Sequence, residues 1–236
     1  MLHLIGKKAL ASKANRIAFA AFPALVTFIG FKESYETALN VFLFLSPYLY
    51  LVLSQDMAAN EIESGMLENI LFLKGGFRPY LMMKSFVLSL IGFAYTSLLF
   101  SVLVLYGIIS NRFAWATCTP FLLGALVGSY YVQLGGLLSL FLRGGANVLL
   151  IIVAQAGVFI AALFSATQRT GFVAGLAKGD ISGLTSSLKF LAVLAALPNL
   201  VLARRLFVYA IAVLCFLAAA FGVQFMVIRR LELTRK

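Results

Sequence analysis

Residues that carry catalysis and metal binding are scarce in this sequence. Among 236 residues there are one histidine, two cysteines and eight acidic residues, and charged residues of all kinds make up only 11%. His3 stands alone, and Cys118 and Cys215 lie far apart in apolar stretches with no second sulfur or imidazole nearby, so metal-ligand spacing is absent. We therefore expect no catalytic residue, no metal site and no cofactor on this chain.

The composition instead indicates a chain whose solvent is lipid. Hydrophobic residues make up 62% of the sequence, the mean hydropathy is +1.01, and a soluble fold could not bury that much apolar surface. The net charge of +11 suits basic residues that flank membrane spans and contact lipid headgroups, so membrane lipids rather than nucleic acid are the expected partners. The sequence predicts an all-α polytopic membrane protein with a single transmembrane domain over residues 1–236.

Six apolar runs approach the length that a bilayer requires, which is about 20 residues for a core of about 30 Å. They cover residues 17–31, 37–53, 81–109, 115–142, 146–166 and 206–228. The rest divides into an interfacial helix (1–16), a cytoplasmic region (55–80), an outer loop with short helices (167–205) and a cytoplasmic tail (229–236). Spans 1 and 2 fall within 17–54, and spans 3 to 5 within 81–166.

The apolar piece 190–203 decides the topology. It is too short for an ordinary span and is broken by Pro198 and Asn199. If it does not span, 12 of the 19 Lys and Arg lie on the cytoplasmic side, which agrees with the positive-inside rule; if it spans, that bias disappears. We therefore expect re-entrant or outer-surface helices here. We also expect a multi-pass protein of the plasma membrane with both termini in the cytoplasm.

The first sixteen residues are basic and precede the first apolar run. Lys7, Lys8, Lys13 and Arg16 lie there, and no small-residue cleavage site closes the run, so we expect a retained anchor rather than a cleaved signal. Residues 2–15 also separate an apolar face from a basic face, which is typical of a helix lying on the membrane surface. A plain solvated leader would carry similar charge.

Half of the acidic residues fall between the second and third spans, at Asp56, Glu61, Glu63 and Glu68, and none lies inside a predicted span. Proton-coupled carriers usually place an acid within the membrane, at a cost of about 2.5–3.5 kcal/mol, so this absence argues against that class. Apolar residues recur here at helical spacing, which predicts an amphipathic helix with Glu61 and Glu68 on one face and Gly65 between them. Asp56 is expected to cap it. From physics alone, these glutamates could simply be solvated.

The order Glu61-Ile-Glu63-Ser-Gly65-Met-Leu67-Glu68, followed by Leu71 and Lys84, resembles the cytoplasmic E-x-E-x-G-T-L-E segment of ABC-2-type transporter permeases. Met66 stands where that pattern usually has Thr. The resemblance implies that this segment is a coupling helix that meets a cytoplasmic ABC ATPase subunit, with Glu61, Glu63, Gly65 and Glu68 at the interface. Arg143 would be a smaller contact or, equally, a charge that sets orientation.

The same resemblance implies two permease subunits, identical or different, and two ATPases, with outward transport by alternating access. No G-x-x-x-x-G-K-[ST] sequence occurs in this chain, so ATP and Mg²⁺ are expected on the partner ATPase and the chain itself is not an enzyme. The substrate is not indicated by any residue.

Each of the small and polar residues within the spans allows two interpretations, a functional role or ordinary helix packing. Gly124 and Gly128 share a helix face and would permit close contact with a second subunit, although such spacing is common by chance. Four polar side chains would line a translocation path or bond neighbouring helices, the second being the commoner role; they are Gln133, Asn147, Gln155 and Gln224.

Three other classes fit less well. An intramembrane hydrolase needs acids or histidines that the predicted spans lack. A stand-alone channel or secondary carrier shares the composition and would differ from a permease in not depending on an ATPase. A membrane anchor or immunity-type protein would have no need of an acidic amphipathic helix.

Overall fold

The computed structural model describes residues 12–59, 61, 77–165, 171–203 and 205–233. Within these ranges all regular structure is helical. The α-helices are α2 (Lys13–Lys32), α3 (Tyr35–Leu53), α6 (Phe77–Ile109), α7 (Cys118–Leu138), α8 (Ala146–Ser165), α9 (Phe172–Ala177), α10 (Ser186–Ala195) and α11 (Leu206–Leu233). Two short 3-10 helices, η1 (Trp115–Thr117) and η2 (Pro198–Leu202), precede α7 and α11.

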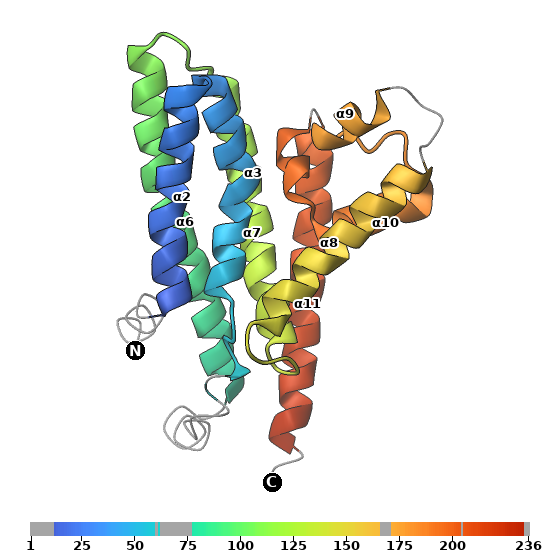
Figure 1. The fold of residues 1–236 in the computed structure, drawn as a ribbon. Helices are drawn as coiled ribbons and strands as arrows, with labels where there is room; N and C mark the ends of the chain where they lie inside the picture. Colours follow the sequence, from blue (N-terminus) through green and yellow to red (C-terminus); the bar gives the residue numbers. More distant parts are fainter. Residues whose placement is uncertain (1–11, 60, 62–76, 166–170, 204, 234–236) are drawn as a thin grey trace.

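Five helices are long and apolar enough to cross a membrane: α3, most of α6, η1 with α7, α8, and most of α11. The chain is therefore consistent with a multi-span membrane protein. The helices run up and down, so that α2 begins and α11 ends at the same end of the molecule (Figure 1). We call this the basal end; it also holds the residues that follow α3 and the turn from α7 to α8. The opposite, apical end holds the α2–α3 turn, the α6–α7 loop and α9 (Figure 1).

The helices α3 and α7 form the centre of the bundle. In their most apolar stretches 56% and 61% of the residues are buried, against 17% in α8 and in α11. The Tyr50 ring of α3 lies so close to α7 that a Cβ at Gly128 would come within 2.5 Å of it. The outer helices α8 and α11 therefore leave most of their apolar surface to lipid.

Two prolines inside α2 and α3 free a backbone carbonyl, and each carbonyl finds a hydroxyl donor. Pro23 has no N–H for the carbonyl of Phe19, which accepts a hydrogen bond from the Tyr95 hydroxyl instead. Pro47 leaves the Leu43 carbonyl, to which the Ser46 hydroxyl donates at 3.2 Å. Each bond gives the freed carbonyl a new hydrogen-bond partner within the protein.

Several expected boundaries move. The α2 helix begins at Lys13, so the last residues of the expected surface helix belong to it, and residues 2–11 lie outside the described part of the chain. The α6 helix already begins at Phe77, inside the region expected to be cytoplasmic. The α7 helix ends at Leu138 rather than at 142, and α11 continues through the expected tail to Leu233.

The piece expected to be re-entrant or on the outer surface enters the bundle from the apical end. The chain runs inward along α10, reverses at Ala196 in a left-handed conformation (φ 46°), and returns through η2 to the start of α11. Here η2 packs against α3 and α7, with Leu200 and Val201 at most 1% exposed. The segment therefore turns back within the helix bundle, and we call it re-entrant in that sense only.

Candidate functional site

The residues that follow α3 fold back against three helices at the basal end. The Ser54 hydroxyl donates to the Leu51 carbonyl at 2.7 Å and ends α3 tightly. A Cβ at Gly135 of α7 would lie only 2.0 Å from this hydroxyl oxygen, so glycine is required for α7 to approach. The first residue after α3 is therefore fixed against α7.

Side chains and backbone then attach this segment to the turn between α7 and α8. The Gly145 N–H donates to Asp56 Oδ1 at 2.9 Å, and the Ala58 N–H donates to the Ser139 hydroxyl at 2.9 Å. The Asn147 side chain, fully buried at the start of α8, donates to the carbonyls of Ser54 and Gly135, each at 3.0 Å. The expectation that Asp56 caps a helix is wrong: it has a φ of 49°, and its carboxylate binds the distant turn.

A buried ion pair attaches the same segment to α6. Lys84 Nζ lies 2.8 Å from Glu61 Oε1, and the side chains are 11% and 2% exposed. The Tyr80 hydroxyl donates to the same carboxylate oxygen at 2.9 Å, and Lys84 also donates to the Met57 carbonyl at 2.7 Å. A buried pair is tolerated when further hydrogen bonds satisfy both charges, as they do here.

These contacts form one structure, which we call the basal clamp. It consists of residues 54–61 as far as they are described, with their partners Tyr80, Lys84, Gly135, Ser139, Gly145 and Asn147. Because the partners come from α6, α7 and α8, a force applied to this segment would reach three helices directly. The basal clamp therefore ties the described part of this segment to three helices at once.

The structure places the expected interface residues unequally. Glu61 is buried against α6, so the reading of Glu61 as a solvated side chain is wrong. Glu63, Gly65 and Glu68 lie outside the described residues. Arg143 is exposed at the basal end. It lies in the turn between α7 and α8, whose Gly145 N–H donates to the Asp56 carboxylate.

A second polar cluster lies deep in the bundle, at the turn of the re-entrant segment. The last carbonyls of α10 have no partner in their own helix, and side chains from α7 and α8 take them: Tyr130 binds Leu194, Gln155 binds Ala195 and Tyr131 binds Ala196. Gln155 also donates to the Tyr131 oxygen and accepts from the Tyr48 hydroxyl of α3 at 3.1 Å. We call this cluster the re-entrant tip.

Its depth follows from helix geometry. Tyr131 is the fourteenth residue of α7, which begins at the apical end, and at 1.5 Å per residue it lies about 20 Å along the helix. The turn of the segment therefore lies well inside the helix bundle, where Ala196 is fully buried.

The expected pathway residues therefore differ in their surroundings. Gln155 bonds neighbouring elements, which accounts for its polarity without a translocation path. Gln133 is 8% exposed and Gln224 is fully buried; among the described residues, the Gln133 carbonyl oxygen and both polar atoms of Gln224 have no hydrogen-bond partner. A Cβ at Gly136 would lie 3.4 Å from the Gln224 amide, so this side chain faces the basal half of α7.

The glycines expected to meet a second subunit are buried within the chain. A Cβ at Gly124 would lie 3.2 Å from Ser46 Oγ of α3 and 3.6 Å from Val201 of η2. Gly128 admits the Tyr50 ring. This packing accounts for the small residues without a second copy of the chain.

Sequence reasoning missed most of the residues that build these two clusters. Lys84 had a signal, because it is a charge three residues inside the expected span 81–109 and so required a buried partner. The tyrosines of α7 gave no such signal, since an aromatic residue in a span is ordinary. Among the residues that the structure describes, no group of histidine, cysteine or acidic side chains could hold a metal ion.

Comparison of the chain with protein-family models, curated proteins and solved structures gives no match.

Proposed function

We propose that this chain is the membrane-spanning permease subunit of an ATP-binding-cassette transporter of the ABC-2 type. The observation that carries the proposal is the basal clamp. The acidic segment that resembles a coupling helix continues directly from residues that are bound to α6 through Glu61 and Lys84 and to α7 and α8 through Asp56 and Asn147. Such a segment transmits a push from outside the membrane to the helices within it.

In this proposal the ATPase interface lies on Glu63, Gly65 and Glu68, with Arg143 as a smaller contact, while Glu61 holds the segment to α6. Acidic side chains at the rim of an interface set the register and choice of partner more than the affinity. ATP and Mg²⁺ stay on the separate ATPase subunit. Closure of two ATPases would move the clamp, and with it α6, α7 and α8, in alternating access that carries a substrate outward.

The membrane arrangement proposed has six spans, α2 being the sixth in addition to the five long apolar helices. The basal end would then be cytoplasmic, with both termini inside a plasma membrane. The assignment of the basal end to the cytoplasm rests on the charge count of the whole sequence, which puts 12 Lys and Arg inside and 7 outside. The described basic residues lie at both ends, with Arg143, Arg229 and Arg230 at the basal end and Lys32, Arg112 and Lys178 at the apical end. A second permease subunit would complete the transporter.

A stand-alone channel or secondary carrier is the alternative. It is favoured by one observation. In the basal half of the bundle, the buried Gln224 amide and the buried Gln133 carbonyl oxygen have no hydrogen-bond partner among the described residues, and such groups would suit a polar path. The two functions differ in whether an ATPase binds the chain.

The test is affinity purification of the tagged protein from membranes of the native cell, followed by mass spectrometry of the proteins that co-purify. The wild type is compared with a variant that carries Glu63→Lys and Glu68→Lys. We expect an ABC ATPase with the wild type and at least a tenfold lower recovery with the variant. Glu61 is left unchanged, because breaking its buried pair would unfold the clamp and confuse the result.

The matched control is Glu33→Lys with Glu36→Lys, which reverses two exposed charges at the apical end. It should leave ATPase recovery unchanged. If no ATPase co-purifies with the wild type, the permease proposal is wrong and the channel or carrier is favoured. If both variants lose the ATPase equally, the acidic segment is not the interface.

A further inference from the structure

The helices α2 and α6 meet at Phe19 and Tyr95, and an open space lies beside this contact. The Phe19 ring meets the Tyr95 ring edge to face, with centroids 4.4 Å apart and planes at 85°, and the Tyr95 hydroxyl binds the Phe19 carbonyl that Pro23 left free. Elsewhere α2 packs along α3, through residues such as Phe22 and Val26. This contact joins α2 to α6 near the basal end of α2.

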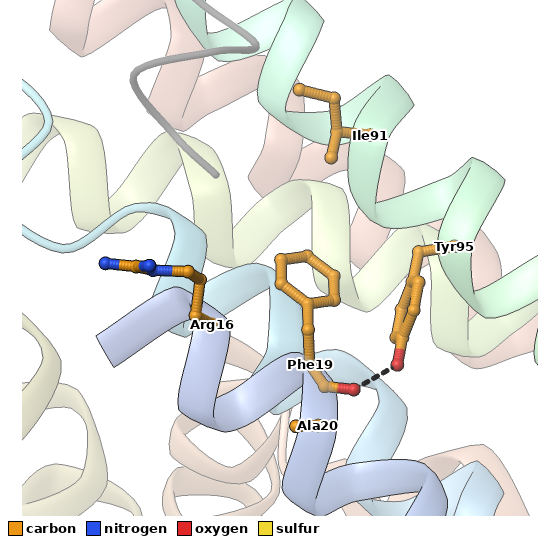
Figure 2. Close-up of a pocket in the computed structure, with 5 residues that line it drawn as sticks. All are labelled: Arg16, Phe19, Ala20, Ile91 and Tyr95. Carbon is orange, nitrogen blue, oxygen red and sulfur yellow. Dashed lines mark hydrogen bonds between the residues drawn. The ribbon is translucent and has the colours of Figure 1, made fainter. Parts of the chain in front are cut away.

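On the basal side of this contact the two helices border a cavity that is open to the surface. Its volume is about 450 Å³, within the range of about 300–1,000 Å³ that is typical of ligand sites. Its lining consists of Arg16, Phe19 and Ala20 from α2 and Ile91 and Tyr95 from α6. Figure 2 shows the Phe19 ring between Arg16 and Tyr95, with Ile91 on the opposite helix. The walls are apolar, and the one charge is the Arg16 guanidinium.

Arg16 has the position and chemistry of a phosphate ligand. It is exposed near the start of α2, directly before the apolar run, and no acidic side chain in the described part of the chain forms an ion pair with it. A guanidinium binds phosphate oxygens through two parallel N–H groups, which gives orientation as well as attraction. Lys13, one turn earlier on α2, adds positive charge at the same end.

We propose that this cavity is a binding site for an anionic phospholipid, with the phosphate on Arg16 and an acyl chain against Phe19, Ala20 and Ile91. Charge complementarity favours an anionic lipid, because a basic side chain near a membrane surface contributes about 1 kcal/mol of attraction. The apolar walls exclude free phosphate as the occupant, since most of the cavity offers no polar partner. The site does not depend on the proposed transport function.

Native mass spectrometry of the delipidated, full-length protein in detergent tests the charge. The probes are palmitoyl-oleoyl phosphatidylglycerol and the zwitterionic palmitoyl-oleoyl phosphatidylcholine. We expect one phosphatidylglycerol to bind at least fivefold more tightly than phosphatidylcholine, and Arg16→Gln to weaken it about fivefold, the factor that corresponds to about 1 kcal/mol. Lys13→Gln, the matched control, should have a smaller effect, and Arg16→Lys should keep most of the preference.

A second pair of variants tests the cavity without changing charge. Ala20→Phe fills it, whereas Ala24→Phe adds the same bulk one turn further along α2, where Ala24 lines a different groove beside α3. Only Ala20→Phe should abolish the tight phosphatidylglycerol, with size-exclusion profiles unchanged in both. The proposal is overturned if the two lipids bind equally, if Arg16→Gln and Lys13→Gln act alike, if Ala20→Phe still binds, or if millimolar inorganic phosphate displaces the lipid.

Discussion

The basal clamp and the re-entrant tip solve the same problem with different chemistry. Both hold a non-helical piece of chain against the helices around it, and in both the freed backbone groups find side-chain partners. The clamp uses a charged pair, Glu61 with Lys84, close to the basal ends of the helices. The tip uses neutral hydroxyl and amide groups about 20 Å into the bundle.

Depth explains the difference. A charge costs more the further it lies from the headgroups, whereas a hydroxyl or amide that meets a carbonyl carries only the ordinary cost of a hydrogen bond. The ion pair near the basal end attaches the segment strongly, and loss of either partner is strongly destabilising because it leaves an unpaired buried charge. Neutral bonds at depth give a weaker attachment that tolerates rearrangement. If the helices move during function, rearranging the re-entrant tip costs less free energy than rearranging the basal clamp.

The largest effect should follow from breaking the clamp pair. Lys84→Met leaves the Glu61 carboxylate buried without its cation, which costs about 3–5 kcal/mol of unfolding free energy. Glu61→Gln combined with Lys84→Met removes both charges and should recover most of that loss. Titration of the purified protein with SDS in mixed micelles measures both variants against the wild type.

The control for this experiment is Lys32→Met at the exposed apical end of α2, where the ammonium lies 5.7 Å from the centre of the Phe28 ring. An exposed contact of this kind is worth about 0.5–1 kcal/mol. A loss below 1 kcal/mol for Lys84→Met, or no recovery in the double variant, would show that the pair does not hold the segment.

A smaller effect is expected from the close approach of α7 to the residues after α3. A Cβ at Gly135 would lie 2.0 Å from Ser54 Oγ and 2.7 Å from its Cβ, so Gly135→Ala must push the two apart. Gly157→Ala makes the same change within α8, where a Cβ meets nothing within 4 Å. Because helix propensity contributes equally to both, the difference between them isolates the clash.

We expect Gly135→Ala to be less stable than Gly157→Ala by about 1–3 kcal/mol, the usual cost of overpacking, in the same SDS titration. Equal stabilities would mean that the segment after α3 moves aside easily. The clamp would then be too loose to transmit force.

The sequence predicted the helical class and the approximate position of each long helix, because an apolar run of about 20 residues has few other uses. Its prediction that the piece with Pro198 and Asn199 does not span rests on length and charge balance. The structure shows that this piece turns back at Ala196, and its placement in a membrane stays a prediction. Lys84 was visible as a charge inside an apolar run, but its partner was not, because Glu61 lies 23 positions away in the sequence. Spacing along one helix says nothing about such a pair.

The tip was beyond prediction for a related reason. Tyr130, Tyr131 and Gln155 look ordinary in an apolar span, and their partners are backbone carbonyls that become free only where α10 ends. Asp56 was assigned to a cap because that is the common role of an acid before a helix, and tertiary contact with Gly145 prevailed. Predictions from local sequence spacing failed wherever the hydrogen-bond partner came from an element distant in the sequence.

The smallest effect, and the sharpest contrast with the clamp, should come from Tyr131→Phe. It removes the hydroxyl that donates to the Ala196 carbonyl and accepts from Gln155, while the ring keeps its packing. Hydrogen bonds between membrane helices average about 0.6 kcal/mol and reach about 1.7, so the loss should fall within that range. Tyr106→Phe, on an exposed tyrosine of α6, is the matched control and should change nothing. If Tyr131→Phe costs as much as Lys84→Met in the SDS titration, the re-entrant segment is held as firmly as the clamp, and the tip would not be the part of the bundle that yields first.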